Sequence, residues 1–240
     1  MIMKKMRSAY TLTELLVASA VGSIVMAMAF SSFSVINQKY QKYSDLSNLH
    51  RSATQVLNII TRDLRMAGYQ DLDTANGLIA LAVITENNSN SNRGSDAITI
   101  TYDADTQKRI KVKYYLACKD LNQCTESEGR YRLYKSKSSK TNGSSWIVDY
   151  ENQAVADYID DLQFNYNMAN GNSQASIDNA EIKDLRSIDI SIMLRTARKH
   201  IKDENYRHEL EDNDGFNLDG GYIRETFSTT AYTRNLELGG

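Results

Sequence analysis

A single carboxylate stands near the start of a long apolar segment. Glu14 is the only Asp, Glu, Lys or Arg between Arg7 and Lys39, and the predominantly apolar run extends from Tyr10 to Ile36. At about 1.5 Å per helical residue, this run crosses a hydrocarbon core of roughly 30 Å. A charge near the middle of such a helix costs at least ~2.5–3.5 kcal/mol in membrane insertion. A carboxylate near its start is therefore expected to have a counter-charge or another structural or functional role. Thr11 and Glu14 also have the spacing of a capping box, in which the carboxylate caps the first turn of the helix.

The residues before this run do not have the order of a secretory signal peptide. Such a peptide has a short apolar region of about 7–15 residues that is followed by a small-residue cleavage site. Here the basic residues Lys4, Lys5 and Arg7 are followed at once by the small residue Ala9, and the long apolar run comes afterwards. The processing point therefore precedes the apolar helix, which stays in the mature protein.

The segment Ala9-Tyr-Thr-Leu-Thr-Glu14-Leu resembles the class III leader of type IV prepilins and of type II secretion pseudopilins. The resemblance implies cleavage by a prepilin peptidase between Ala9 and Tyr10, followed by methylation of the Tyr10 amine. Glu14 becomes the fifth residue of the mature chain and pairs with the Tyr10 amine of its own or a neighbouring subunit. This pairing aligns subunits as their apolar helices assemble.

The chain after the membrane segment continues the helical pattern. Apolar residues recur at intervals of three and four, which predicts one buried stripe, at Leu46, Leu49, Ala53, Val56, Ile60, Leu64 and Ala67. Arg51, Arg62, Asp63 and Arg65 fall off the stripe and are expected to be solvated. Gly68 is well placed to end a helix that begins near Tyr10, and the absence of proline leaves no local break. The stretch from Arg62 to Tyr69 resembles the helix end of PilW-type minor pilins and, more loosely, of GspJ-type pseudopilins.

Beyond Gly68 the period shifts towards two, which is typical of antiparallel strands with one covered face. Eight strands are predicted, at Leu78–Ile84, Ala97–Tyr102, Ile110–Leu116, Tyr131–Tyr134, Trp146–Tyr150, Leu162–Tyr166, Ile188–Leu194 and Arg224–Thr233. Polar connections are predicted at Asn87–Gly94, Lys135–Ser145 and Asn167–Asn179. The fold class is α+β, with a long N-terminal helix packed on an antiparallel sheet, as in type IV pilins.

The remaining candidate sites are few. Cys118 and Cys124 are expected to close a small disulfide loop in an oxidising compartment; a metal site is the alternative, but the spacing is not CxxC. Glu211–Asp219 is an acidic segment without the EF-hand spacing, so a solvated loop is preferred to a calcium site on Asp212, Asp214, Asn217 and Asp219. Calcium is the one cofactor considered.

The three histidines and one group of lysines also form no recognisable site. His50, His200 and His208 form no ligand or catalytic motif, which argues against an enzyme. Lys135, Lys137 and Lys140 are expected to lie in a solvated basic loop, with DNA contact as the alternative. The part beyond the anchor is mildly acidic, with 25 basic and 29 acidic residues by subtraction of Lys4, Lys5, Arg7 and Glu14 from the totals of 28 and 30. Nucleic acid binding is therefore not indicated.

The sequence predicts four segments: a leader at 1–9, a transmembrane and filament-core helix at 10–36, its amphipathic continuation at 37–68, and a β-rich periplasmic head at 69–240. The basic leader predicts a cytoplasmic amino terminus and a translocated carboxyl-terminal domain. The resemblance implies a single-pass inner-membrane protein that later joins a filament at the cell surface. The resemblance implies a non-catalytic minor pilin that primes or caps a type IV pilus. Its expected partners are other minor pilins, the major pilin, prepilin peptidase and the inner-membrane assembly platform. The alternatives are a GspJ-type pseudopilin and a bitopic membrane protein with a periplasmic binding or enzymatic domain.

Overall fold

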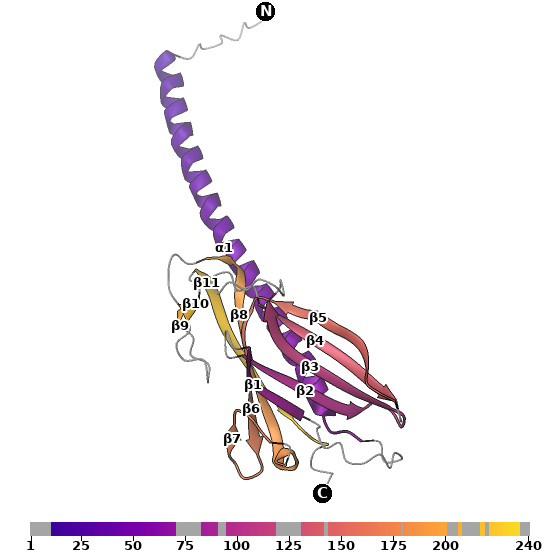
Figure 1. The fold of residues 1–240 in the computed structure, drawn as a ribbon. Helices are drawn as coiled ribbons and strands as arrows, with labels where there is room; N and C mark the ends of the chain where they lie inside the picture. Colours follow the sequence, from indigo (N-terminus) through magenta and orange to yellow (C-terminus); the bar gives the residue numbers. More distant parts are fainter. Residues whose placement is uncertain are drawn as a thin grey trace, which may run out of the picture. The chain divides into compact units, whose positions relative to one another are not determined.

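The fold of the 240-residue chain is given by a computed structural model, shown in Figure 1. The structure describes residues 11–70, 83–90, 95–118, 131–141, 144–178, 180–200, 206–207, 217–218 and 221–235. The chain divides into two compact units, Met1–Asp45 and Leu46–Gly240. The first contains the apolar part of the long helix α1, and the second contains the rest of α1 together with the strands.

Helix α1 covers Leu12–Met66 and confirms the predicted continuous helix. The chain has no proline, so nothing in its sequence breaks the helical hydrogen-bond ladder. Gly68, the residue predicted to end the helix, lies two positions beyond Met66, and its φ of 73° is a left-handed conformation that is costly for a residue with a Cβ. The Gly68 N–H donates to the carbonyl of Thr101 at 3.0 Å, which ties the end of α1 to a strand.

The first sheet has five antiparallel strands in sequence order, as Figure 1 shows. Each strand pairs with the next one along the chain, which is the simplest way to satisfy strand backbones. The strands are β1 (Val83–Asn90), β2 (Ser95–Asp103), β3 (Lys108–Cys118), β4 (Tyr131–Thr141) and β5 (Ile147–Asp157).

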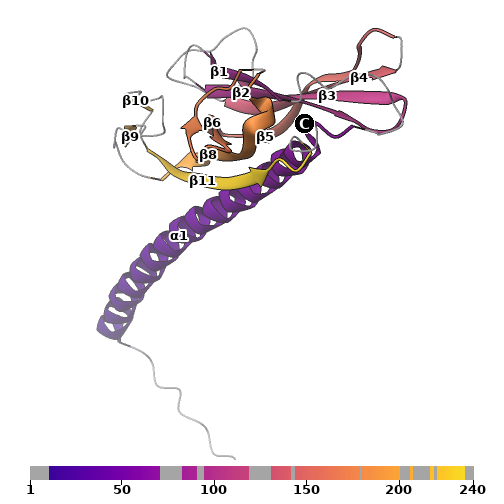
Figure 2. The same cartoon turned by 90° about the horizontal axis from the view of Figure 1, so that it is seen from below.

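The second sheet has the strand order β11-β8-β6-β7 and is also antiparallel. Figure 2 shows β11 running beside α1, in agreement with the 2.9 Å distance between the His50 Nε2 and a Glu225 carboxylate oxygen. Its strands are β6 (Ile159–Met168), β7 (Ser173–Gln174), β8 (Leu185–Lys199) and β11 (Tyr222–Tyr232), and the short helix η1 (Ile182–Asp184) precedes β8. A third pairing joins β9 (Tyr206–Arg207) to β10 (Asn217–Leu218).

The stripe predicted on α1 forms one hydrophobic core with both larger sheets. All its members are buried except Leu46, which is half-buried. They pack with apolar side chains that alternate along β2, β3, β6 and β8, among them Ile98, Tyr114, Phe164 and Ile190. The predicted α+β class, with a long helix on antiparallel strands, is confirmed.

Several expected strand and loop boundaries are wrong. Asn87–Asn90 belongs to β1, Lys135–Thr141 to β4, and Asn167–Met168 and Ser173–Gln174 to a β6–β7 hairpin. These segments are rich in Asn, Ser and Lys, which favour loops locally, but backbone pairing with a neighbouring strand overrides that preference. The first predicted strand overlaps β1 only at its end, and residues 78–82 lie outside the described residues.

Candidate assembly site

The start of α1 forms the capping box that the sequence predicts. The backbone N–H and the hydroxyl of Thr11 both donate to Glu14 Oε2, at 2.9 and 3.0 Å, and the Glu14 N–H donates back to the Thr11 hydroxyl at 3.3 Å. These bonds satisfy N–H groups that have no partner within the helix. Ala9 and Tyr10 lie outside the described residues, so cleavage, methylation and the ion pair with Glu14 remain predictions.

The membrane part of α1 presents its apolar side chains outward. Large side chains on all its faces are exposed, including Leu15, Met26 and Phe30. Within the described residues, α1 is the one helix with the length and hydropathy to cross a membrane. These exposed side chains match a helix whose surroundings are lipid or neighbouring apolar helices.

The polar side chains of this segment bond within the helix itself. The hydroxyls of Ser19 and Ser23 donate to the carbonyls of Leu16 and Ala20, at 2.9 and 2.8 Å. Such bonds lower the cost of placing hydroxyls in hydrocarbon. Apart from the two adjacent residues and the nearby backbone of the helix itself, no atom lies within 4 Å of the position where a Cβ at Gly22 would stand, so this side of the helix leaves room for close approach by another helix.

Within the second unit, a buried ionic cluster joins α1 to the first sheet. Asp63 is buried, and its Oδ2 accepts hydrogen bonds from the Tyr114 hydroxyl at 2.6 Å and from Lys135 Nζ at 2.7 Å. Burial first, and the Asp63 charge second, raise the pKa of Tyr114 well above its ordinary value. The expectation that Asp63 is solvated is wrong, although Arg51, Arg62 and Arg65 are exposed as expected.

The expectation of a basic loop at Lys135, Lys137 and Lys140 is also wrong, because these residues lie in β4. Lys135 is only 14% exposed and pairs with Asp63, whereas Lys137 lies 3.9 Å from Asp149. The sequence contained one clue to the ionic cluster: Asp63 directly precedes Leu64 of the apolar stripe, so it lies close to the boundary of the buried face. Its partners Tyr114 and Lys135 are 51 and 72 residues away, beyond the reach of any local pattern.

A second buried ionic cluster links three strands of the other sheet. Asp160 of β6 is almost fully buried, and the Arg224 Nε of β11 donates to its Oδ2 at 2.7 Å. The Arg195 Nε of β8 lies 3.5 Å from the other carboxylate oxygen, and the Arg195 guanidinium stacks 4.4 Å from the Tyr222 ring centre. Removing one partner of such a cluster leaves a buried charge, so its evident role is to hold the three strands together.

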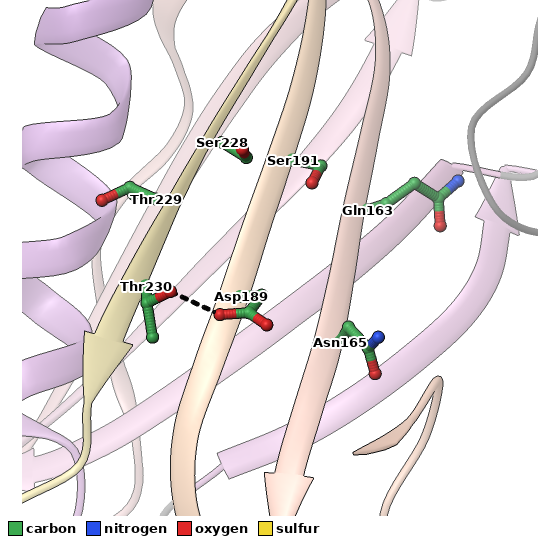
Figure 3. Close-up of a pocket in the computed structure, with 7 residues that line it drawn as sticks. All are labelled: Gln163, Asn165, Asp189, Ser191, Ser228, Thr229 and Thr230. Carbon is green, nitrogen blue, oxygen red and sulfur yellow. Dashed lines mark hydrogen bonds between the residues drawn. The ribbon is translucent and has the colours of Figure 1, made fainter.

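The outer face of that sheet carries a polar groove of about 390 Å³. Figure 3 shows its side chains on three neighbouring strands, with the Thr230 hydroxyl donating to Asp189 Oδ1 at 2.6 Å. Its lining residues are Gln163, Asn165, Asp189, Ser191, Ser228, Thr229 and Thr230. Asp189 is the only ionisable group among these lining residues, and its second carboxylate oxygen accepts a hydrogen bond from the Asn167 side-chain amide at 2.9 Å. The groove therefore has the character of a solvated sheet face.

The remaining predicted sites fall largely outside the described residues. Cys118 ends β3 and is disulfide-bonded, but Cys124 is not among the described residues, so the predicted pairing stays a prediction. Asp212, Asp214 and Asp219 are also outside them, and Asn217 is described only as part of the backbone of β10. Across the part of the chain that the structure describes, no group of three or more His, Cys, Asp and Glu side chains could hold a metal ion.

Comparison with known proteins first defines the class. Residues 4–30 match the prokaryotic N-terminal methylation motif, which coincides with the leader, the capping box and the membrane part of α1. The chain is thus a prepilin-type, type IV pilin-like protein with an N-terminal membrane helix. More particularly, residues 42–213 match the family described as prepilin peptidase-dependent protein B, and the chain belongs to that family.

Similarity of this chain to curated proteins and to solved structures is low or absent. No curated protein matches the sequence. Among solved structures, the chain is similar to the type IV-like pilin TTHA1219 from Thermus thermophilus, with 12% sequence identity and a TM-score of 0.47. That match covers 78% of this chain and 96% of the other.

Proposed function

We propose that this protein is a minor, structural subunit of a type IV pilus, which primes or caps the filament. In this proposal, prepilin peptidase cleaves between Ala9 and Tyr10, the Tyr10 amine is methylated, and the head lies in the periplasm before assembly. The helix then leaves the inner membrane and packs against the helices of other minor pilins and of the major pilin at the assembly platform.

The observation that carries this proposal is the start of α1. A carboxylate stands at the first turn of an apolar helix, and residues 4–30 match a motif that is defined by methylation of the amino terminus. When neighbouring helices exclude water, a charged amine beside Glu14 offsets the cost of burying the carboxylate. Subunits in the wrong register lack this pairing, and the resulting penalty selects one arrangement of helices.

The capping box supplies a sharp test of the pairing. Glutamine serves as well as glutamate at the third position of a capping box, so Glu14→Gln keeps the helix start and removes only the charge. We expect normal cleavage of the variant, measured by mass spectrometry of the mature amino terminus, but strongly reduced incorporation into sheared filaments. Thr13→Ser, which changes a neighbouring polar residue without altering charge, is the matched control. Full incorporation of Glu14→Gln would leave capping as the only role of this residue.

A clean deletion tests whether the protein belongs to a type IV pilus or to a type II secretion system. Surface pili and type II secreted proteins are scored from the same cultures, with complementation by the wild-type chain. Loss of pili with intact secretion supports the pilus assignment. Loss of secretion with intact pili would assign the protein to the pseudopilins, and no change in either would leave a membrane-anchored protein outside both machines.

A further inference from the structure

The part of α1 directly after the apolar run is exposed on every face and changes its chemical character. All residues at 37–43 are exposed, and the Tyr40 and Tyr43 side chains are 72% and 68% exposed. Lys39 and Lys42 are the first cations that follow the apolar run. A tyrosine has an apolar ring with a polar tip, and a lysine has an apolar stem with a charged end. Both side chains therefore suit a boundary between hydrocarbon and water.

The two tyrosines continue the apolar surface of the membrane part. Residues at intervals of three, four and three share one face of a helix, and this spacing joins Phe33, Ile36, Tyr40 and Tyr43. Phe33 and Ile36 are each 66% exposed. The stripe thus passes from aliphatic and phenyl side chains to tyrosines without a break, and Lys39, four residues before Tyr43, lies beside it.

The rise of the helix places these side chains at the level of lipid headgroups. From Leu15 to Ile36 the helix rises about 32 Å, which matches a hydrocarbon core of roughly 30 Å. The headgroup layer adds roughly 5–7 Å on each side, and the Tyr40 backbone lies about 6 Å beyond Ile36. Tyr43 is about 10 Å beyond Ile36, but helical side chains tilt towards the amino terminus, so its ring reaches back towards the hydrocarbon.

The charge of this segment calls for an anionic partner from outside the chain. No Asp or Glu occurs between Glu14 and Asp45, and Asp45 is buried. A second copy at the same depth would add two more lysines and no carboxylate, so it would repel the first. In the proposed orientation Lys39 and Lys42 lie on the translocated side of the membrane, where cations oppose the orientation signal of the basic leader. Membrane orientation therefore does not account for these lysines.

We propose that this segment is a headgroup collar, which binds anionic phospholipids in the outer leaflet of the inner membrane before assembly. The collar comprises Lys39, Tyr40, Lys42 and Tyr43. The lysine ammonium groups bind lipid phosphates, while the tyrosine rings lie between the upper parts of the acyl chains. The inference rests on the proposed function for the orientation of α1. It adds that the collar fixes the depth of the helix, so these lipids must be released when the subunit enters a filament.

Lipid binding by the full-length chain tests the collar directly. Native mass spectrometry of the protein in detergent micelles gives its affinity for dioleoyl phosphatidylglycerol and for dioleoyl phosphatidylcholine. Each lysine near an anionic surface contributes roughly fivefold to binding, so Lys39→Gln with Lys42→Gln should weaken phosphatidylglycerol binding at least about tenfold. Lys39→Arg with Lys42→Arg should keep wild-type affinity. The charge-matched control is Arg51→Gln with Arg65→Gln, two exposed cations further along α1, and it should bind like wild type.

Two results of this titration would overturn the collar. Equal losses in the lysine and arginine double variants would show that cations anywhere on the helix attract the lipid. Equal affinity of the wild-type chain for both lipids would show that no anionic headgroup is selected. Because all four substituted positions are exposed, unchanged circular dichroism of the variants separates an effect on binding from unfolding.

The depth of the segment is measured separately, with a single tryptophan as reporter. Trp146 is the only tryptophan of the chain, so Trp146→Phe removes the background signal, and Tyr40→Trp then introduces an interfacial reporter. In vesicles of phosphatidylcholine and phosphatidylglycerol, lipids brominated near the headgroup should quench Tyr40→Trp most strongly. Lipids brominated deep in the acyl chain should quench Val25→Trp most strongly, and neither lipid should quench Thr54→Trp.

The outcomes distinguish failure of the collar from failure of the proposed function. Quenching of Val25→Trp without quenching of Tyr40→Trp would overturn the collar and leave the membrane helix intact. Absence of quenching at both positions would reject the membrane orientation on which both proposals depend. A neighbouring subunit is the competing occupant. If a benzophenone at Gln41 gives protein adducts and no lipid adduct in membranes cleared of filaments by shearing, the segment belongs to a partner and the collar is wrong.

Discussion

Substitution of the buried Asp63 is predicted to destabilise the head more than substitution of most of its other polar residues. Asp63→Asn keeps the size of the side chain and an acceptor for Tyr114, but leaves the Lys135 ammonium without its counter-charge. Removing one partner of a buried pair costs ~3–5 kcal/mol. Lys135 retains 14% exposure and gains some hydration, so we expect the lower value, about 3 kcal/mol.

The assay is thermal unfolding of the full chain in detergent micelles, followed by circular dichroism. For a domain of about 150–250 residues, each kcal/mol shifts Tm by about 2–4 °C, so Asp63→Asn should lower Tm by roughly 6–12 °C. Arg62→Ala is the control, since Arg62 is 71% exposed and lies 3.5 Å from the same carboxylate. Because the Arg62 side chain is largely solvated, its removal should cost less than ~1 kcal/mol.

A double replacement distinguishes the effect of an unpaired buried charge on stability from the effect of side-chain packing. Asp63→Leu combined with Lys135→Met removes both charges, and apolar replacement of a buried pair is commonly neutral or stabilising. The double variant should therefore unfold at a higher temperature than either single variant. A Tm of Asp63→Asn within about 1 °C of wild type, or strictly additive losses in the double variant, would refute the argument.

Three further predictions concern the core, the helix end and alkaline pH. Ile60→Ala, in the fully buried stripe, should cost ~2–5 kcal/mol in urea unfolding, whereas exposed Gln55→Ala should change stability by less than ~0.5 kcal/mol. Gly68→Ala should cost ~1–2 kcal/mol in the same assay, because Gly68 has a φ of 73°; an unchanged stability would contradict a left-handed helix end. Burial and the Asp63 charge raise the pKa of Tyr114 above its ordinary value of 10.0 in the folded state. The stability that Tyr114 contributes to the folded state is therefore complete below about pH 10 and is lost as pH rises through the folded pKa. Urea unfolding between pH 8 and 11 should show a steeper loss for wild type than for Tyr114→Phe, and identical slopes would contradict this.

Much of the fold followed from local pattern. The capping box, the start and end of α1 and its buried stripe depend on residues three or four positions apart, and the structure confirms each of them. The strands that alternate clearly, such as Ile98–Tyr102, were also found from their period of two. The polar ends of β1 and β4 were missed, because their pairing with a neighbour along the sheet is invisible to local propensity.

The sequence by itself determined the class of this protein: a basic leader, a capping box and an apolar helix lie next to one another along the chain, and their order alone defines the prepilin type. Tertiary structure alone decided which charges are buried and which strand lies at the end of the described five-stranded sheet. Asp63 meets Lys135 across 72 residues, and Asp160 meets Arg224 across 64. β5 carries exposed Ile147 and Val148 because it ends the described five-stranded sheet, and the position of a strand within a sheet depends on long-range pairing.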